Sequence, residues 1–438
     1  MLQYLWIPVS TGMTTIFQAV NLRWNIREEQ VNLMHQVAIT GIGIVSTLGT
    51  GKEKVKESLQ KGRSGIRIDL HRKDLGFRSA LTGYIDDFIQ PGLDRKRCRT
   101  MTGFGLQAYA AAVEAMEAAG WSEEMVQNER TGIIIGNDSS TVANFQQVNI
   151  TLKEHGTFDI GASLVFQAMN STVSMNLNTI LGTRGASWTL SGACASGGHA
   201  IGQASDLIAM GRQDRMICGG VQEITWESVA SFDATNAFSL REDYPQNASR
   251  PFDKGRDGLV PSGGVAIVAL ERYDLAKKRG ADILGKIHAY SFSSDGSKLS
   301  VPSGEGLERC IRECLKLAEI TTDKVDYICA HATSTPIGDM MEAKAIYNVF
   351  GPATPWVSSV KAMTGHEMWM AGAAQVVYSV IMGLEGFIAP NINFEQQEEG
   401  APPLKIAVET IDERPGIILC NSAGFGGTNS CLLLGTTS

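Results

Sequence analysis

Cys194 lies in a run of small residues that would let a substrate carbonyl approach a thiol. The stretch around it reads TLSGACASGGHAIG, in which Gly and Ala predominate. A thiol in such a setting can act as a nucleophile that takes an acyl group. An arbitrary cysteine among small residues is more often a small buried apolar side chain. The chemical interpretation therefore depends on partners elsewhere in the chain.

His331 opens a second segment with chemical potential, ICAHATSTPIGDMMEAKAI. A single histidine at a loop entry is commonly structural, but this loop also carries hydroxyl and acidic side chains. We expect Pro336 and Gly338 to force a loop after the histidine, with a helix starting at Asp339. The polar groups that favour a functional role are Thr333, Ser334, Thr335, Asp339 and Glu342.

His366 lies in a third segment, SSVKAMTGHEMWMAGAAQ, shortly after Lys361. Apolar residues recur at helical spacing after this histidine, which predicts that it stands near a helix N-terminus. The positive end of the helix dipole disfavours imidazolium, so we predict a neutral ring that donates from Nε2–H to a developing oxyanion. Glu342 is a candidate ion-pair partner for Lys361, although two solvated charges are the alternative.

A Gly-rich segment, GFGGTN, lies between two apolar strands near the end of the chain. Its glycines allow close backbone approach, and the amide of Phe425 could point at a substrate oxygen. A tight turn between strands is the plainer interpretation. The segment is a poor phosphate loop, because no Lys-Ser/Thr pair follows it.

One thiol, two imidazoles and glycine-rich amide donors together indicate acyl transfer through a thioester. The thiol takes the acyl group, and the amides stabilise the oxyanion of the tetrahedral intermediate. Two neutral imidazoles can also stabilise the enolate that forms when a carboxylate is lost. The combination therefore favours more than simple hydrolysis.

The nucleophile must be held by the elements on either side of it. Apolar residues at every second position precede Cys194, and residues with helical spacing follow it. This pattern predicts a strand-to-helix turn, where helix amides and the positive dipole end would favour the thiolate form of Cys194.

The rest of the chain alternates between short apolar runs and helical patterns, which predicts an α/β fold. Helical spacing is clearest over residues 104–119 and 304–318. Both halves run strand, helix, strand and Gly-rich loop, a weak sign of duplication. The predicted strands cover residues 37–45, 132–136, 215–219, 264–270, 283–290, 325–330, 416–419 and 431–434.

Composition sets the broad class of the protein. The chain has 438 residues, of which 43% are hydrophobic and 19% charged, and a formal net charge of −8. This balance is globular, and the negative charge makes nucleic acid an improbable partner. The eight cysteines contain no CxxC pair, so we expect no disulfide framework or metal site and a cytoplasmic location.

Residues 1–33 differ from the rest of the chain, because their apolar residues show no clear period. They contain no basic stretch followed by an apolar core, and no apolar run long enough for a membrane span. We expect them to be an N-terminal extension outside the core, with the folded enzyme beginning near Met34.

The chain resembles the β-ketoacyl–acyl-carrier-protein synthases, and most closely the bacterial type I elongating synthases among them. The resemblance runs from about Met34 to Leu434, and its motifs occur in the same order. They are GACAS, HATSTPIGD, KAMTGH, FIAPNINFE and NSAGFGGTN.

The resemblance implies a thiolase-like fold of two similar halves in five layers, α-β-α-β-α. The halves would be residues 34–282, with the nucleophile, and 283–438, with the histidines, Lys361 and the Gly-rich loop. The family forms homodimers across a central strand, although a related subunit could replace one copy. No metal or organic cofactor is implied, because acyl carrier protein brings the substrates on its phosphopantetheine.

The resemblance also implies roles in decarboxylative condensation. Cys194 would take the acyl chain, and His331 and His366 would assist decarboxylation of malonyl-carrier protein and hold the enolate oxygen. Lys361 would orient the site together with Glu342. The product would be 3-oxoacyl-carrier protein and CO₂, in fatty acid or polyketide elongation.

Further roles are implied for groups around these residues. The amides of Cys194 and Phe425 would form the oxyanion hole, and the Phe425 ring would gate the malonyl side. Thr333 and Thr335 would hydrogen-bond the phosphopantetheine arm. The basic segment DRKRCR places Lys96 and Arg99 where the family docks its acidic carrier protein, although a charge run is commonly just a solvated surface.

The chain departs from the family pattern at Ala332, Trp369, Met370 and Ala423, and two of these exchanges change the side-chain volume most. Trp369 stands where a Gly is usual, and Ala423 where a Phe is usual. If both side chains face one space, the two exchanges would compensate in volume. We expect a reshaped acyl pocket, unless Trp369 packs away from the site.

Three alternatives arise from the same residues. The chain could be a specialised-metabolite ketosynthase that builds a polyene or resorcinol-type chain. It could be a non-catalytic partner of the chain-length-factor kind, although such partners usually lack the nucleophilic cysteine. A thiolase is disfavoured, because its final loop would carry a second cysteine and GFGGTN has none.

Overall fold

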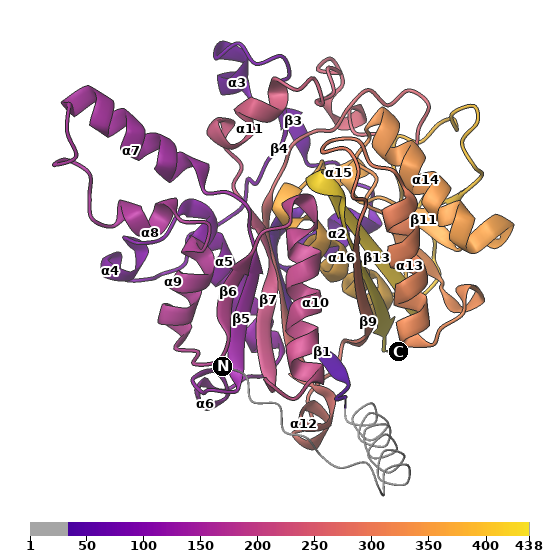
Figure 1. Ribbon diagram of the computed structural model, residues 1–438, viewed down its shortest axis with the longest axis horizontal. Coiled ribbons are helices and arrows are strands. Elements are labelled where there is room, and N and C mark those ends of the chain that lie inside the picture. The colour runs from indigo at the N-terminus through magenta and orange to yellow at the C-terminus, as the bar shows by residue number, and fades with distance from the viewer. Residues whose placement is uncertain (1–33, 438) are drawn as a thin grey trace, which may run out of the picture.

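The computed structural model describes residues 34–437, so the predicted extension over residues 1–33 lies outside the described part. Figure 1 shows helices on the outside and between the strands of one continuous, strongly bent sheet. Within residues 34–437, no helix combines the length and the apolar character needed to cross a membrane.

The first half of the chain contributes one end of the 12-stranded sheet. Its strands are β1 (Val37–Ser46), β5 (Thr131–Gly136), β6 (Ser187–Leu190), β7 (Arg215–Gln222) and β8 (Gly264–Arg272). They lie in the order β1-β8-β7-β5-β6, and β5 pairs in parallel with both β6 and β7. This order leaves β6 at the free edge of the sheet.

The second half repeats this arrangement. Its strands are β9 (Gly285–Ser294), β10 (Tyr327–Cys329), β11 (Trp356–Ser358), β13 (Ile417–Gly424) and β14 (Thr428–Thr436). Their order is β9-β14-β13-β10-β11, with the short β12 (Lys405–Ile406) beyond β11. In each half the first strand lies beside the last, so the topology supports the sign of duplication in the sequence.

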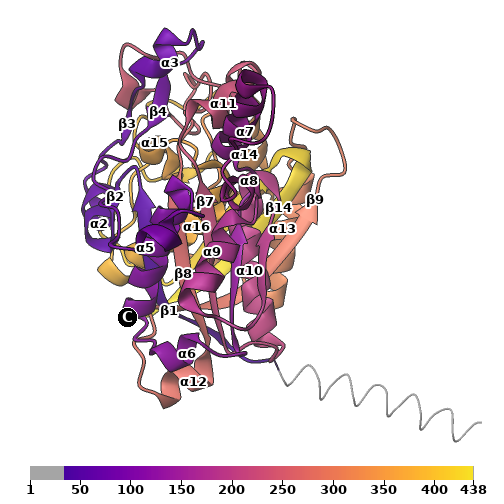
Figure 2. The same cartoon turned by 90° about the vertical axis from the view of Figure 1, so that its left-hand side faces the viewer.

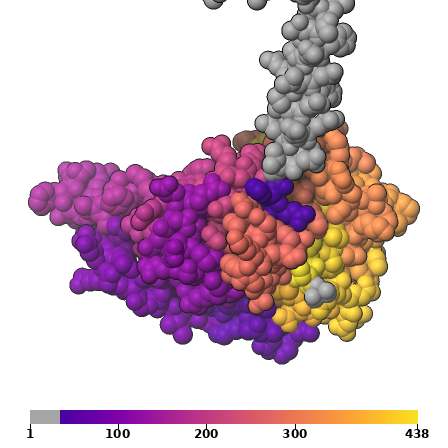
Figure 3. All heavy atoms as spheres, turned by 90° about the horizontal axis from the view of Figure 1, so that it is seen from below, coloured from indigo at the N-terminus to yellow at the C-terminus, as the bar shows by residue number. Residues whose placement is uncertain are grey.

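The two halves meet where β1 pairs antiparallel with β9, with Val37 opposite Ile287. In the space-filling view of Figure 3, the first half fills one side of the molecule and the orange-to-yellow second half fills the other. The pairing makes one sheet of the two sets of strands, so the halves share a single core.

Helices α10 (Ser196–Ala209) and α16 (Ala371–Glu385) form the central layer between the two halves of the sheet. In β7, Met216 and Cys218 join the apolar cluster around these two helices. Ile217 joins a different cluster, on the outer face of the sheet. That outer cluster belongs to α5 (Gly103–Ala118) and α9 (Thr172–Leu181).

The second half is layered in the same way. Tyr327 and Cys420 face α10 and α16, whereas Ile328 and Leu419 face the opposite side. The outer helices there are α13 (Glu305–Ala318) and α14 (Pro336–Phe350). The order is therefore helices, sheet, helices, sheet, helices, which confirms the five-layered thiolase-like fold. Strands buried on both faces also explain why the strand segments read as unbroken apolar runs.

Smaller elements surround this core (Figure 2). The helices are α2 (Lys52–Gln60), α3 (Leu70–Asp74), α4 (Arg95–Cys98), α6 (Glu123–Val126), α7 (Thr141–Glu154), α8 (Leu164–Ala168), α11 (Trp226–Asp233), α12 (Tyr273–Lys278) and α15 (Lys361–Thr364). The strands are β2 (Gly49–Thr50), β3 (Ile66–Ile68) and β4 (Leu81–Gly83). Helix α7 projects from the body of the first half, with α8 beside it and α4 beyond α8 (Figure 1).

Glycines let the two central helices approach closely. A Cβ added to Gly372 would lie 2.5 Å from the backbone nitrogen of Gly198. A Cβ on Gly197 would lie 2.9 Å from the backbone nitrogen of Ala373. Because the chemistry-bearing loops precede α10 and α16, this contact brings those loops together.

Candidate active site

Cys194 lies in a short 3₁₀ turn, Ala193–Ala195, between β6 and α10. The predicted strand-to-helix turn is therefore confirmed. Ala193 adopts a φ of 47°, a conformation that side-chain-bearing residues rarely take. Its N–H donates to Oδ2 of Asp138 at 3.1 Å, and this carboxylate holds the turn in place.

The predicted thiolate form of Cys194 is wrong for the resting protein. The side chain is 6% exposed, and burial raises the pKa of the thiol to about 12, although the positive charge of Lys361 opposes the shift. Burial removes water from the thiolate, and the resulting rise in the thiol pKa exceeds the lowering by the helix N-terminus and Lys361. The nucleophile is therefore protonated at neutral pH.

His331 and His366 lie edge to face, with ring centroids 5.3 Å apart and planes at 88°. Burial, and then the charge of Lys361, lower the pKa of both rings well below the usual value. The predicted neutral state of His366 is confirmed, but its main cause is burial rather than a helix end. The Nδ1 atoms of both rings are sealed and have no partner within residues 34–437, which leaves Nε2 for a substrate.

Asp339 organises the loop that follows His331. Its two carboxylate oxygens accept hydrogen bonds from backbone N–H groups of Thr333 (3.0 Å), Ser334 (3.2 Å), Thr335 (3.3 Å) and Phe252 (2.8 Å). The hydroxyl oxygens of Thr333 and Thr335 lie 3.1 Å apart. The structure therefore presents the two predicted hydroxyls side by side.

Pro336 does not lengthen this loop, as its position in the sequence suggested, but begins helix α14. Proline suits the first helical position, because its N–H would have no partner there and its φ is already helical. The helix thus starts before Asp339, and the loop is shorter than predicted.

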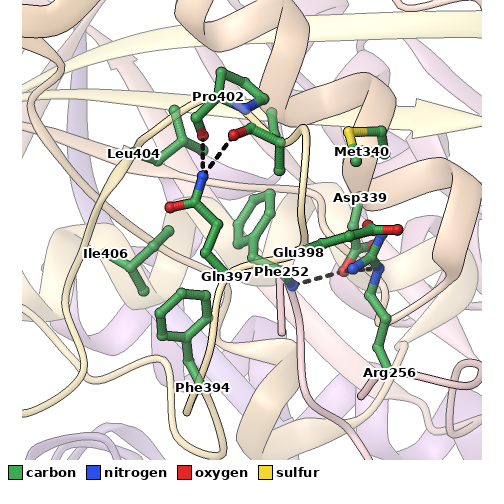
Figure 4. A pocket seen from close by; sticks show the side chains of 12 residues that line it. Phe252, Arg256, Asp339, Met340, Phe394, Gln397, Glu398, Pro402, Leu404 and Ile406 are labelled. Carbon is green, nitrogen blue, oxygen red and sulfur yellow. Dashed lines mark hydrogen bonds and ion pairs between the residues drawn. The ribbon is translucent and has the colours of Figure 1, made fainter. Parts of the chain in front are cut away.

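Behind the Thr333–Thr335 loop lies a small pocket, shown in Figure 4. The buried guanidinium of Arg256 donates to the carbonyl oxygens of Thr335 (3.1 Å) and Pro336 (2.5 Å). It also forms an ion pair with Glu398 at 2.6 Å, and its Nε lies 3.8 Å from Oδ2 of Asp339. These contacts fix the loop from its rear side.

The predicted ion pair between Lys361 and Glu342 does not form. One Glu342 oxygen accepts the backbone N–H of His331 at 2.7 Å and the side-chain amide of Asn421. Within residues 34–437, the buried Nζ of Lys361 has no hydrogen-bond partner. Glu342 therefore acts on the His331 backbone, and Lys361 stands as an unpaired charge beside the thiol and the imidazoles.

Glu367 is a buried carboxyl group that reasoning from the sequence missed. It directly follows His366, is 1% exposed and accepts a hydrogen bond from the Tyr378 hydroxyl at 2.5 Å. Burial raises its pKa to about 7. An acidic residue inside an otherwise apolar helix-start segment was the available signal.

The GFGGTN segment packs against the nucleophile turn. A Cβ on Gly424 would lie 2.8 Å from the carbonyl oxygen of Gly192 and 3.0 Å from Cβ of Ala193. The adjoining Phe425 ring is 44% exposed and stacks on Phe232, with centroids 6.0 Å apart. The oxyanion hole of the Cys194 and Phe425 amides stays a prediction, but the two loops do touch.

Trp369 lies in the same apolar cluster as Cys194 and is 8% exposed. Its Nε1–H donates to Oγ of Ser139 at 3.0 Å. Ala423 lies in β13 and does not belong to that cluster. The structure therefore does not support volume compensation between Trp369 and Ala423.

The predicted docking residues Lys96 and Arg99 are exposed in and directly after α4. Arg97 between them pairs with Asp94 at 3.3 Å. Lys153, at the end of α7, is paired with its neighbour Glu154. Within residues 34–437, Lys96 and Arg99 form no ion pair, so both charges are available to an acidic partner.

Two family descriptions match the chain. The beta-ketoacyl synthase N-terminal domain matches residues 34–276, and the beta-ketoacyl synthase C-terminal domain matches residues 284–395. Together they cover well over half of the sequence.

Characterised relatives are similar over their whole length. The 3-oxoacyl-[acyl-carrier-protein] synthase 1 of Haemophilus influenzae is 41% identical over 404 residues, which are 91% of this chain and 98% of that protein. The 3-oxoacyl-[acyl-carrier-protein] synthase 1 of Escherichia coli is 39% identical over 405 residues, 92% of this chain and 99% of that one.

Solved structures share the fold. A beta-ketoacyl synthase from Burkholderia phymatum has a TM-score of 0.88 and 31% identity, and the ishigamide ketosynthase/chain length factor has 0.86 and 28%. A type II polyketide ketosynthase in complex with its acyl-carrier protein has 0.84 and 27%. Each alignment covers 92% of this chain and 100% of the other.

Proposed function

The chain belongs to the beta-ketoacyl synthase family, and we propose that Cys194, His331 and His366 carry out its condensation. The activity is that of a 3-oxoacyl-[acyl-carrier-protein] synthase, an acyltransferase of fatty acid elongation. One observation supports the assignment of residues above the others. The His331 and His366 rings lie 5.3 Å apart, and Cys194 shares an apolar cluster with Met368 and Trp369 directly after His366, so the thiol and both imidazoles lie in one site.

In the first step, the sulfur of Cys194 attacks the thioester carbon of an acyl-carrier protein. A new bond forms between sulfur and the acyl carbon, and the bond to the carrier sulfur breaks. Because Cys194 rests as a thiol, its proton must leave with the carrier, which departs as a thiol. The amides of Cys194 and Phe425 would hold the oxyanion of the tetrahedral intermediate.

In the second step, malonyl-carrier protein loses its carboxylate as CO₂. The electron pair of the broken carbon–carbon bond becomes an enolate, whose oxygen needs hydrogen-bond donors. His331 and His366 are neutral, and each would donate from Nε2–H, since the Nδ1 atoms are buried away from any substrate. Neutral donors aimed at a developing negative charge in a buried site lower the barrier to its formation.

In the third step, the enolate carbon attacks the acyl carbon on Cys194. A carbon–carbon bond forms, the carbon–sulfur bond breaks, and 3-oxoacyl-carrier protein leaves. The expelled thiolate takes a proton from solvent, because burial makes the thiol its stable form. The cycle therefore consumes one proton, which balances the carboxylate that became CO₂.

The carrier protein would reach this site from the side of α4. Lys96 and Arg99 supply exposed positive charge there for an acidic partner. Thr333 and Thr335 would hydrogen-bond the phosphopantetheine arm, since Asp339 holds their hydroxyls side by side.

We further propose that the enzyme works as a homodimer of two-halved subunits, with halves at residues 34–282 and 283–438. The free edge of β6 and the exposed apolar side chains of α7 and α8 support a partner on that side. A purely structural role as a chain-length-factor partner is disfavoured, because Cys194, both histidines and Lys361 are all present and assembled.

The proposal is tested by intact-protein mass spectrometry after incubation with acyl-carrier proteins. The wild-type protein is expected to gain one acyl group and then to release 3-oxoacyl-carrier protein when malonyl-carrier protein is added. Cys194→Ala should gain none. Cys314→Ala, which removes a buried cysteine of the outer helix α13 away from the site and from α4, should behave like wild type. A wild-type protein that forms no acyl adduct, or an adduct that persists in Cys194→Ala, would refute the assignment.

A further inference from the structure

We propose that Trp369 closes the acyl-binding space beyond Cys194, so that the enzyme is charged with short acyl chains. This inference rests on the proposed function, because it names the class of acyl group that Cys194 carries. The indole of Trp369 lies in the apolar cluster around the nucleophile.

Apart from Ala193, the side chains that cluster with Cys194 are large, unlike the small ones that flank it in sequence. Cys194 and Trp369 are 6% and 8% exposed, so little open space adjoins either group. Phe232 faces the indole with ring centroids 6.1 Å apart. The other members of the cluster are Phe77, Ala193, Val229, Phe238, Leu259 and Met368. An apolar chain on the sulfur must therefore enter a region already filled by aromatic rings.

The indole is held in place at its polar end. Its Nε1–H donates to Ser139 Oγ at 3.0 Å, across a separation of 230 residues in the chain. The residue before Ser139, Asp138, accepts the N–H of Ala193 in the nucleophile turn. One short loop therefore anchors both the turn that carries the sulfur and the ring that limits the space next to it.

The backbone of Trp369 has no room to retreat either. A Cβ added to Gly220 would lie 2.9 Å from the Trp369 carbonyl oxygen, and one added to Gly197 would lie 3.1 Å from it. The backbone thus rests directly on β7 and α10. Any widening of the acyl space would have to come from rotation of the indole, which breaks its bond to Ser139 and its contact with Phe232.

The chemical consequence is a limit on chain length. Where apolar space is available, each added methylene strengthens binding roughly fourfold. Where the space ends, further methylenes must displace packed atoms, and the gain becomes a loss. A chain that starts at the Cys194 sulfur meets the indole early, so acetyl and other short primers should load and long saturated chains should not.

The test compares acetyl-, hexanoyl- and dodecanoyl-carrier protein as donors, with the rate of adduct formation on Cys194 as the readout. Wild type is expected to load acetyl at least about tenfold faster than dodecanoyl. Trp369→Gly should remove most of this preference and make longer 3-oxo products with malonyl-carrier protein. Ser139→Ala and Trp369→Phe should give intermediate profiles, and they carry the test if Trp369→Gly does not fold.

Trp356→Phe is the matched control. Trp356 also donates a hydrogen bond from its indole, to Glu413 at 3.1 Å, but it lies in β11, next to the edge strand β12 of the second half. Its profile should equal that of wild type. If wild type loads dodecanoyl as fast as acetyl, or if the Trp369 and Ser139 variants load Cys194 with an unchanged preference, the inference is overturned and the proposed function stands. If no donor acylates Cys194, the proposed function itself fails.

Discussion

Cys194 lies where its neighbours favour the thiolate, but it is also buried, which disfavours the thiolate. It stands at the N-terminus of α10 and beside the unpaired charge of Lys361, both of which favour a thiolate. It is also buried, and burial is the largest influence on its pKa, which rises to about 12. The sulfur is therefore protected as a thiol at rest and becomes a good nucleophile only as its proton leaves.

This electrostatic balance predicts how Cys194 reacts with iodoacetamide. Because the thiolate is the reactive form, a thiol with a raised pKa is scarcely ionised at neutral pH. The alkylation rate of Cys194 should rise about tenfold for each pH unit between about pH 7 and pH 10, without levelling off near the usual thiol pKa of about 8.5. Peptide mapping of the modified protein against time measures this rate.

Lys361→Met is the informative variant for the same experiment. Loss of the positive charge should raise the Cys194 pKa further and slow its alkylation at every pH, while Cys98 remains unaffected. A Cys194 rate that levels off below about pH 9 would show that the thiol ionises normally and that burial does not dominate.

The catalytic candidates could be predicted from their sequence motifs, but the residues that hold them in position through hydrogen bonds could not. Cys194, His331 and His366 stand in short segments whose neighbours reveal them. Ser139 and Asp138 gain their roles only when the chain brings residues 137–140 against the nucleophile turn and Trp369. The failed Lys361–Glu342 pair has the same cause, because the sequence does not show that the His331 backbone and Asn421 occupy the carboxylate.

At the scale of elements, the site depends on how closely α10 can cross α16. Each helix follows one of the chemistry-bearing loops, so the distance between the helices sets the distance between the nucleophile and His366. The glycines at the crossing leave no space for side chains, as the approach of Gly372 to Gly198 shows. These glycines reduce the distance between α10 and α16 rather than providing flexibility.

Gly372→Ala should therefore damage both stability and catalysis. The added Cβ would lie 2.5 Å from the Gly198 nitrogen and 2.8 Å from Ser422 Oγ, so the helices must separate. Overpacking of this kind costs about 1–3 kcal/mol of unfolding free energy, and the condensation rate should fall with it. Urea unfolding and a condensation assay measure the two effects.

Gly103→Ala is the matched control for this variant. Gly103 is the first residue of α5, and a Cβ there would meet nothing within 4 Å. Alanine should be neutral or stabilise the protein by up to about 1 kcal/mol. If Gly372→Ala were as stable and as active as Gly103→Ala, the crossing would not set the geometry of the site.

The elements themselves were largely predictable because the strands are buried on both faces. Runs such as residues 264–270 need apolar side chains at every position, and such runs stand out from the helical patterns. Helix α14 begins before the predicted start at Asp339, because Pro336 suits the first turn of a helix as well as a loop. A hydrophobic pattern alone does not distinguish these two uses of proline.

The whole molecule is built from one strand order used twice. In both halves the first strand lies next to the last, and the two first strands, β1 and β9, pair at the junction. The sequence carries only a weak sign of this repeat, because strand order is set by contacts between distant segments. The two halves differ at their outer edges, since β12 pairs with β11 in the second half whereas β6 is an open edge in the first.

The open edge of β6 adjoins an exposed apolar surface. Trp188 in β6 is 42% exposed, and an isolated chain would leave that surface in water. The remaining exposed apolar side chains of α7, α8 and the segments beside them are Phe145, Val148, Leu152, Phe158, Val165, Phe166 and Met169. A second copy of the chain placed edge to edge against β6 would cover both the unpaired strand and these side chains.

Sedimentation of the wild-type protein should therefore give the mass of a dimer, and Trp188→Asp should shift it towards the monomer. Truncating a central aromatic anchor commonly costs about 2–4 kcal/mol of association free energy, and a carboxylate in a dry interface should cost no less.

Leu317→Asp is the control, because Leu317 is 55% exposed on α13, an outer helix of the second half, and should leave the dimer intact. Condensation activity should fall with the dimer fraction, since β6 leads directly into the nucleophile turn and loses its support when the partner leaves. A monomeric wild type, or a Trp188→Asp variant as dimeric as Leu317→Asp, would place the subunit contact elsewhere.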